Sequence, residues 1–144
     1  MSEQSRIFVC PHCLTLNRVA SGKEALAKCG KCGTKVFEPR SVELVGSTID
    51  RHIVKNGAPV LVDFYSPGCG PCLMMAPHFE DAARQLYPHV RLMKIDTSVE
   101  LAVANRFGIQ ASPTLAIFRG GREIVRQPGA MSGPDIVAWT RRFV

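Results

Sequence analysis

The chain has 144 residues, which is enough for one hydrophobic core and a second small unit. Its 46% hydrophobic and 21% charged content is typical of a folded globular protein and excludes a disordered chain. No apolar run reaches the roughly 18 residues of a membrane-spanning helix, and residues 1–6 lack the basic-then-apolar profile of a signal peptide. We therefore expect a cytoplasmic protein.

The net charge of +6 divides into +4 for residues 1–40 and +2 for residues 41–144. A small basic unit could contact nucleic acid or acidic proteins. Its lysines and arginines are not clustered among aromatic residues, however, so a solvated surface is the simpler interpretation. We expect neither a nucleic-acid partner nor a membrane contact.

Two C-x-x-C pairs occupy the first part of the chain, Cys10 with Cys13 and Cys29 with Cys32, and fifteen residues separate them. This spacing is typical of a four-cysteine zinc site. Each pair turns tightly enough for both sulfurs to face one ion, and two pairs complete a tetrahedron of thiolates. Four protein ligands leave no open position, so the sequence predicts one structural zinc ion that largely folds this unit.

Two disulfides or four free thiols are the alternatives, and a cytoplasmic location favours zinc. His12 is a further candidate ligand, but four cysteines leave it no coordination position, so we expect a solvated side chain. The proline of Phe37-Glu38-Pro39-Arg40 marks a break in composition. We place a boundary there, with a zinc-binding module at residues 1–40 and a second domain at residues 41–144.

After residue 40, strands and helices are predicted to alternate. Residues 41–45 are a short strand, and Ser47 is the predicted N-cap of a helix that ends near Asn56-Gly57. The β-branched and aromatic run from Val60 to Tyr65 is a buried strand, followed at once by a Ser-Pro-Gly turn. A long helix comes next, because apolar residues recur at helical spacing at Met75, Phe79, Ala82, Ala83 and Leu86.

The remaining chain continues this alternation. Residues 90–95 are a third strand, and Ser98 begins a helix with Leu101 and Ala104 on one face. Residues 114–118 and 123–127 flank Gly120-Gly121, a typical hairpin turn. Ser132 begins a last helix with a capping box, whose apolar side carries Ile136, Trp139, Thr140 and Phe143. This order predicts an α/β fold with a mixed, mostly parallel central sheet and helices on both faces.

The third C-x-x-C pair, Cys69-Gly70-Pro71-Cys72, lies where the strand that ends at Tyr65 gives way to a helix. A cysteine here lies among unpaired N–H groups at the positive end of the helix dipole, which favours thiolate over thiol. Since the thiolate attacks disulfides, Cys69 is the predicted nucleophile. Cys72, one turn further on, is expected to be more buried and to act as the resolving thiol.

Asp63 is the one charge within the apolar run from Val60 to Tyr65. Burial of an ionised carboxylate is costly, so desolvation is expected to raise the pKa of Asp63. A carboxyl with a raised pKa near the second thiol is a candidate proton acceptor for Cys72. The alternative is that Asp63 only accepts local hydrogen bonds.

Residues 41–144 resemble the thioredoxins. The resemblance rests on Cys-Gly-Pro-Cys after a strand with a lone Asp, on Ser112-Pro113-Thr114, which is similar to the family's cis-proline loop, and on Pro128-Gly129-Ala130, which is similar to its substrate loop. It implies a thioredoxin fold and a cis Pro113 against the Cys69 sulfur, and it supports the role of Asp63.

The chain also departs from the family in two places. Thioredoxins usually have Trp where this chain has Gly68, so an apolar rim beside the nucleophile is missing. They often pair the Asp with a lysine on the next strand, and counting back from Asp96 that position is Leu92 here. Lys94 is two residues away on the same face, so a different ion-pair geometry is expected.

The resemblance also implies the activity. It suggests a zinc-containing, two-domain bacterial member of the thioredoxin 2 type, which reduces protein disulfides, binds no organic cofactor and is recycled by an NADPH-dependent thioredoxin reductase. A disulfide isomerase is one alternative, and a zinc-dependent binding protein or chaperone with a thioredoxin-like scaffold is another. The expected substrate surface is flat and consists of small residues: Gly68, Gly70, Pro71, Ala111, Ser112, Pro113, Pro128, Gly129 and Ala130.

Overall fold

The computed structural model describes residues 4–144 of the chain. It begins with an antiparallel hairpin of β1 (Ser5–Val9) and β2 (Leu16–Ala20), followed by the short 3₁₀ turn η1 (Glu24–Leu26). The elements that follow are β3 (Val42–Leu44), η2 (Gly46–Thr48), α1 (Ile49–Lys55), β4 (Val60–Tyr65), α2 (Gly70–Leu86), β5 (Arg91–Asp96), α3 (Leu101–Arg106), β6 (Thr114–Arg119), β7 (Arg122–Pro128) and α4 (Gly133–Arg141).

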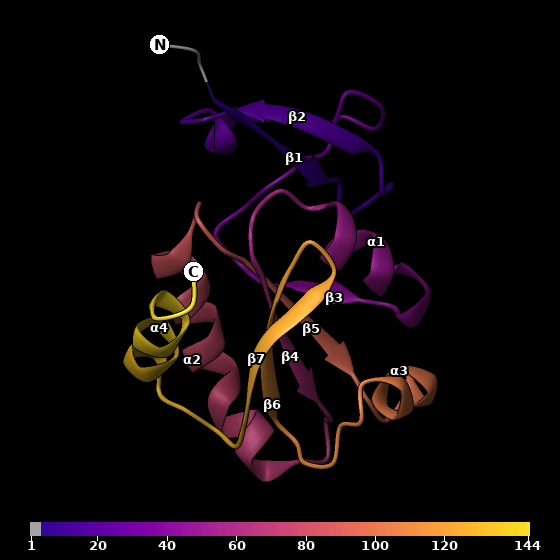
Figure 1. Ribbon diagram of the computed structural model, residues 1–144, viewed down its shortest axis with the longest axis vertical. Helices are drawn as coiled ribbons and strands as arrows, with labels where there is room; N and C mark the ends of the chain where they lie inside the picture. The colour runs from indigo at the N-terminus through magenta and orange to yellow at the C-terminus, as the bar shows by residue number, and fades with distance from the viewer. Residues whose placement is uncertain (1–3) are drawn as a thin grey trace.

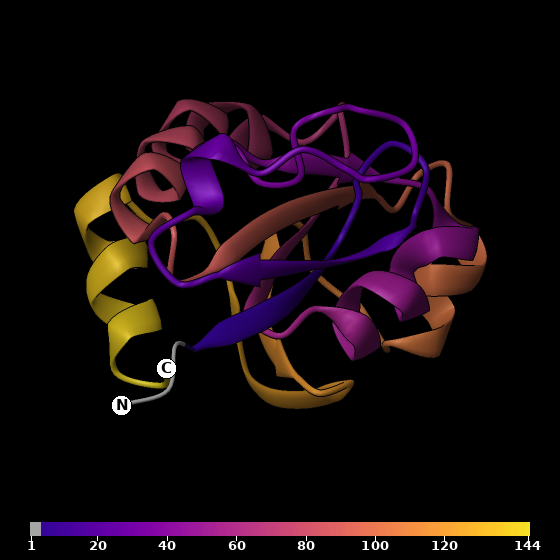
Figure 2. The same ribbon diagram turned by 90° about the horizontal axis from the view of Figure 1, so that it is seen from above.

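Five strands form the central sheet, in the order β3-β5-β4-β6-β7 (Figure 1). β3, β5 and β4 are parallel, whereas β6 is antiparallel to β4 and β7 is antiparallel to β6. Seen from above, α2 and α4 lie on one side of the sheet and α1 and α3 on the other (Figure 2). The predicted α/β fold with a mixed sheet between two layers of helices is confirmed.

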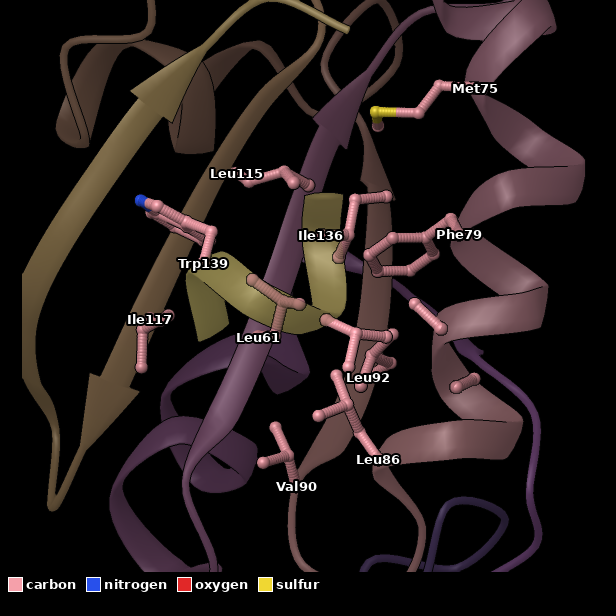
Figure 3. Packing of buried hydrophobic residues seen from close by; sticks show 13 residues of the cluster. Leu61, Met75, Phe79, Leu86, Val90, Leu92, Leu115, Ile117, Ile136 and Trp139 are labelled. Carbon is pink, nitrogen blue, oxygen red and sulfur yellow. The ribbon is translucent and has the colours of Figure 1, made fainter. Parts of the chain in front are cut away.

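The two faces of the sheet bury separate hydrophobic clusters, because successive side chains of a strand point to opposite faces. Leu61 and Leu92 point toward α2, where they pack with Phe79 (Figure 3). Val62, which follows Leu61 in β4, points to the other face and belongs to the cluster that includes Ile53 of α1. Each strand therefore alternates between two cores, and this fixes the face that each polar residue of β4 and β5 occupies.

The N-terminal segment, residues 4–40, lies against the end of the sheet where β4 and β5 begin (Figure 1). Its core contains Phe8, Val36 and Phe37, and it continues into the central domain through Ala58 and Tyr87, which precede β4 and β5. The aromatic rings of Phe37 and Tyr87 meet edge to face, with 4.7 Å between centroids. The segment and the domain therefore share one continuous apolar cluster.

Arg91, the first residue of β5, joins the two parts. Its side chain is only 1% exposed, and its guanidinium donates hydrogen bonds to the carbonyl oxygens of Val9 (3.2 Å) and Val36 (2.5 Å). The guanidinium carbon also lies 4.8 Å from the centroid of the Phe37 ring. The buried charge is thus compensated by backbone dipoles and an aromatic face of the N-terminal segment.

Two predicted helix starts are wrong. Ser47 is not an N-cap: it lies in η2, and Thr48 precedes α1 with its hydroxyl donating to Val45 O at 2.8 Å. Ser98 does not begin α3, because both its N–H and its hydroxyl donate to the Asp96 carboxylate, at 2.9 and 2.6 Å. Such a bond holds the chain in a turn, so the helix starts later.

The buried face of α3 also differs from the prediction. Leu101 is 64% exposed, whereas Val103 is buried in the core. Val103, and not Leu101, therefore packs in the core on this face of the sheet.

The last helix and the hairpin follow their sequence signals. The Ser132 hydroxyl accepts a hydrogen bond from the Asp135 N–H at 3.2 Å, as an N-cap does. Gly120 and Gly121 have φ angles of +59° and +85°, the left-handed values that a two-residue hairpin turn requires. No helix in residues 4–144 is long and apolar enough to cross a bilayer.

Candidate active site and metal cluster

Cys69 is the N-cap residue of α2, directly after the turn that follows β4. Its sulfur accepts a hydrogen bond from the Cys72 N–H at 3.1 Å, and its own N–H donates to Ser66 O at 3.3 Å. Cys69 is half-buried, whereas Cys72 is 5% exposed, and the two are joined by a disulfide. The structure therefore represents the oxidised state, in which Cys69 is the more exposed of the two residues.

The surroundings of Cys69 favour a thiolate once the disulfide is reduced. An N-cap sulfur lies at the positive end of the helix dipole, and the N–H of Cys72 points at it. Hydrogen bonds to the charged form and a nearby positive potential both lower a thiol pKa. Cys72 lies inside the first turn and is buried, so its charged form is less well solvated.

A second loop lies against this sulfur. The Ser112–Pro113 peptide bond is cis, as the resemblance implied, and the Ser112 carbonyl oxygen is 3.3 Å from the Cys69 sulfur. The loop after β7 is tied to the same place, because the Gly129 N–H donates to Pro113 O at 2.8 Å. Three segments far apart in sequence therefore converge on Cys69.

The rim around Cys69 is open and built from small residues. Gly68, Gly70 and Pro71 are exposed. A Cβ atom added at Gly68 or Gly70 would meet no atom of residues 4–144 within 4 Å beyond its chain neighbours. The structure thus leaves room for a polypeptide at the position where many thioredoxins carry a tryptophan.

Sequence reasoning missed an apolar extension of this rim. Met74 is 75% exposed while its neighbour Met75 is buried. Both line a groove of about 230 Å³ that His78, Ala130 and Met131 also border. The helical spacing places Met74 outside the apolar face of α2, and this is the signal that could have identified it.

Asp63 is buried on the face of the sheet that α2 covers. It is 2% exposed, and within residues 4–144 its Oδ1 atom has no hydrogen-bond partner. Burial raises the pKa of Asp63 to about 7, although the positive charge of Lys94 opposes this rise. A carboxyl with such a pKa exchanges its proton near neutral pH.

The pairing register locates the lysine on the neighbouring strand. Asp63 is aligned with Lys94 across β4 and β5, whereas Leu92 is aligned with Leu61 inside the core. Lys94 therefore stands directly beside Asp63, although it is two residues beyond the position inferred from the family. The two side chains nevertheless form no ion pair in the described part of the chain.

The four N-terminal cysteines come together at the other end of the molecule. The sulfurs of Cys10, Cys13, Cys29 and Cys32 all lie within 4.8 Å of one another. Cys10 is 3.6 Å from Cys32 and Cys13 is 3.5 Å from Cys29, sulfur to sulfur. A zinc tetrathiolate with bonds of about 2.3 Å has sulfurs roughly 3.8 Å apart, so the geometry fits this ion.

Backbone N–H groups support the sulfurs of the cluster. The N–H groups of His12 and Cys13 donate to the Cys10 sulfur, each at 3.4 Å, and the Lys31 N–H donates to the Cys29 sulfur at 3.4 Å. Such bonds stabilise thiolates and complete the knuckle of each C-x-x-C pair. The His12 side chain is exposed, as expected for a residue that is not a ligand.

Comparisons with known proteins agree with this geometry. The sequence profile of the family described as thioredoxin matches residues 40–142. Thioredoxin C-3 of Corynebacterium nephridii is 34% identical over 134 residues, which cover 92% of each chain, so its similarity reaches into the N-terminal segment. Thioredoxin 1 of Nostoc sp. is 36% identical over 91 residues, 63% of this chain and 85% of that protein.

A solved structure shows the same fold. Chloroplastic thioredoxin z superimposes with a TM-score of 0.67 at 24% identity, covering 74% of this chain and 96% of the other. Together with the profile match and the Cys69–Cys72 pair, these findings establish the family and its chemistry. The chain belongs to the thioredoxin family of thiol–disulfide oxidoreductases, the protein-disulfide reductases.

Proposed function

We propose that Cys69 is the attacking residue and Cys72 the resolving residue of this reductase. The Cys69 thiolate attacks one sulfur of a substrate disulfide, forms a mixed disulfide and expels the other sulfur as a thiolate. The Cys72 thiolate then attacks the Cys69 sulfur, closes the Cys69–Cys72 disulfide and releases the second substrate thiolate. Two electrons pass from the dithiol to the substrate. The accessible N-cap position of Cys69 is the observation that carries this assignment.

Asp63 is the proposed proton acceptor for Cys72 in the resolving step. Its burial on the face covered by α2 and its pKa of about 7 support this role. At neutral pH a part of the population holds an ionised Asp63, which can take the thiol proton directly or through a water. A carboxyl with an ordinary pKa would be too weak a base for this purpose.

The substrate chain is proposed to lie across the small residues around Cys69. Gly68, Gly70 and Pro71 form one side of this surface, and Ser112, Pro113 and Gly129 form the other. The 3.3 Å approach of the Ser112 carbonyl to the sulfur supports this, because a strand bonded to the Ser112 backbone would bring its own disulfide to Cys69. Small side chains permit that close approach.

For the N-terminal segment we propose a zinc-binding module of residues 1–40 ahead of a thioredoxin domain of residues 41–144, as in the thioredoxin 2 type. The four cysteines would hold one structural ion and keep the hairpin folded. The family match begins at residue 40, which supports the boundary. The proposed setting is the cytoplasm, with disulfide-containing proteins as substrates and an NADPH-dependent thioredoxin reductase as electron donor.

Reduction of insulin disulfides, with NADPH and a thioredoxin reductase, tests the dithiol assignment. Cys69→Ser should abolish turnover, and Cys72→Ser should accumulate the mixed disulfide, which non-reducing electrophoresis detects. Ser47→Ala is the control, since it changes an exposed side chain outside both the dithiol and the cysteine cluster. Substantial turnover by Cys69→Ser would contradict the proposal. A reduction potential near about −270 mV would support a reductase, and one above about −200 mV an isomerase.

A further inference from the structure

Three ionisable residues form a row across three neighbouring strands. Glu43 of β3 is aligned with Lys94 of β5, and Lys94 is aligned with Asp63 of β4. All three share a face with Leu61 and Leu92, the face that α2 covers, because alternate residues of a strand point the same way. Adjacent strands are about 4.8 Å apart, so the lysine stands between the two carboxylates.

Tyr65 contacts two members of this row, Glu43 and Lys94. Its hydroxyl donates a hydrogen bond to Glu43 Oε1 at 2.8 Å, and the Lys94 ammonium nitrogen lies 4.6 Å from the centroid of its ring. A cation above a tyrosine ring is attracted by the ring's electrons. Lys94 makes no ion pair with any carboxylate of residues 4–144. The ammonium group therefore rests on Tyr65 and leaves Oδ1 of Asp63 without a partner.

Burial decreases along the row. Asp63 is buried, Lys94 and Tyr65 are half-buried, and Glu43 is exposed. From the side of α2, the negative charge of Glu80 acts on Asp63, and the Glu80 carboxylate accepts from the Ser41 N–H at 3.0 Å and from the Ser41 hydroxyl. No cation of the described residues other than Lys94 contributes to the charge balance at Asp63.

We propose that Tyr65 and Glu43 are positioning residues that hold Lys94 off Asp63 and thereby set the proton affinity of the buried carboxyl. The inference rests on the proposed role of Asp63 as proton acceptor. Without Tyr65 and Glu43, the long lysine side chain would swing onto the unpartnered Oδ1 atom and form an ion pair with it. Asp63 would then stay ionised at neutral pH and would be a weaker base for Cys72.

The charges of the row act on Asp63 in opposite directions. The positive charge of Lys94 lowers the pKa of Asp63, and the negative charge of Glu43 raises it. Substitution of each residue should therefore shift the titration of the same carboxyl with opposite sign. Opposite signs follow from the two charges alone, so Tyr65→Leu isolates the positioning role: it keeps both charges, removes the hydroxyl and the ring that hold Glu43 and Lys94, and should lower the pKa of Asp63 as the lysine moves onto it.

The test is a carbon-13 NMR titration of the Asp63 carboxyl in the full-length, oxidised protein, where the Cys72 thiol does not titrate. The Asp63→Asn spectrum assigns the signal. Glu43→Gln should lower the pKa of Asp63 by about half a unit or more, and Lys94→Met should raise it by at least as much. Glu123→Gln removes a carboxylate from β7 and should leave it unchanged. Shifts of the same sign in Glu43→Gln and Lys94→Met, or a pKa of Asp63 in Tyr65→Leu within roughly 0.2 units of the wild-type value, would overturn the inference.

A rate measurement separates this inference from the proposed function on which it rests. In the pH profile of insulin reduction, the acidic limb should move to lower pH in Glu43→Gln and to higher pH in Lys94→Met. If Asp63→Asn reduces insulin at the wild-type rate, the role of Asp63 as proton acceptor fails, whatever the titrations show. If Asp63→Asn is slow while the NMR shifts are absent, the positioning role of Tyr65 and Glu43 fails.

Discussion

Asp63 shows how a single buried carboxyl can serve chemistry at the expense of stability. Its Oδ1 atom lacks a hydrogen bond within the described chain, and its neighbours along β4, Val62 and Phe64, are apolar. An ionised carboxylate in such a place is costly, and the fold tolerates it only because Asp63 holds its proton until near-neutral pH. The same property makes it a base of suitable strength for a thiol.

The stability of the protein should therefore depend on pH through Asp63. Its pKa is about 7 in the fold against 3.8 in an unstructured chain. Between these values the folded state binds more protons, so the free energy of unfolding decreases as the pH rises from about 4 to about 7 and then stays level. Asp63→Asn removes this pH-dependent loss of stability. The difference in free energy of unfolding between the variant and the wild type should therefore grow with pH, by at most about 4 kcal/mol.

Urea unfolding of both oxidised proteins at about pH 4.5 and pH 8 measures this difference. Asp50→Asn is a suitable control, because Asp50 is exposed and paired with Arg106, which lowers its pKa. An Asp63→Asn protein whose advantage is equal at both pH values would show that the carboxyl titrates normally in the fold.

At the scale of single residues, the sequence predicted where the reactive groups lie, but it did not predict which residues they contact. The place of Cys69 before a helix and of Asp63 within an apolar run follows from local pattern, and the structure puts both where expected. The alignment of Lys94 with Asp63 does not follow from local pattern, because counting from Asp96 cannot show which residues of β4 and β5 are paired. Register is a property of the assembled sheet.

At the scale of elements, hydrogen-bonding side chains decide where helices begin. Ser132 caps α4 through the Asp135 N–H, whereas Ser47 lies in a 3₁₀ turn and has no capping bond within the described residues. Both residues looked like N-caps in the sequence. The hydroxyl of Thr48, bonded to Val45 O, makes the difference, and no periodicity of apolar residues reports such a bond.

A pair of serine substitutions tests this contrast. Ser132→Ala should lower the free energy of unfolding by about 1 kcal/mol, since the Asp135 N–H loses its acceptor. Ser47→Ala, at an exposed position without a capping bond, should change it by less than about 0.5 kcal/mol. Urea denaturation of the two variants side by side gives the values. Equal losses would mean that Ser47 caps α1 in solution after all.

The strands and the hairpin were predictable for a local reason. The run from Val60 to Tyr65 is apolar apart from Asp63 because both faces of β4 are covered, and Gly120-Gly121 supplies the two left-handed residues of the turn. These signals lie within a few residues of the element that they predict. The later start of α3 depends instead on the Asp96 side chain, which competes for Ser98.

At the scale of the whole molecule, Arg91 couples the N-terminal segment to the sheet. Its carbonyl partners, Val9 and Val36, lie 82 and 55 residues away in sequence. Burial lowers the pKa of Arg91 to about 10, which leaves it charged at neutral pH. In the sequence Arg91 follows a predicted strand start and resembles an ordinary surface residue, so only the tertiary structure reveals its role.

Removal of this side chain should loosen the junction. Arg91→Met leaves two buried carbonyl groups without donors and should destabilise the protein by about 2–4 kcal/mol. Arg84→Met, which removes an exposed arginine paired with Asp81, should cost less than about 1 kcal/mol. Urea unfolding gives the stabilities, and amide hydrogen exchange at Phe8 and Phe37 reports the junction itself. Unchanged protection of these amides in Arg91→Met would contradict the coupling.

The cysteine cluster and the redox pair lie at opposite ends of β4. Ala58, just before β4, packs in the N-terminal core, and Cys69 follows the other end of the strand (Figure 1). The N-terminal segment is thus an attachment point that lies far from the redox site. A bead, a fluorophore or a neighbouring enzyme bound to this segment leaves Cys69 free to meet a substrate, so the protein can be immobilised and remain active.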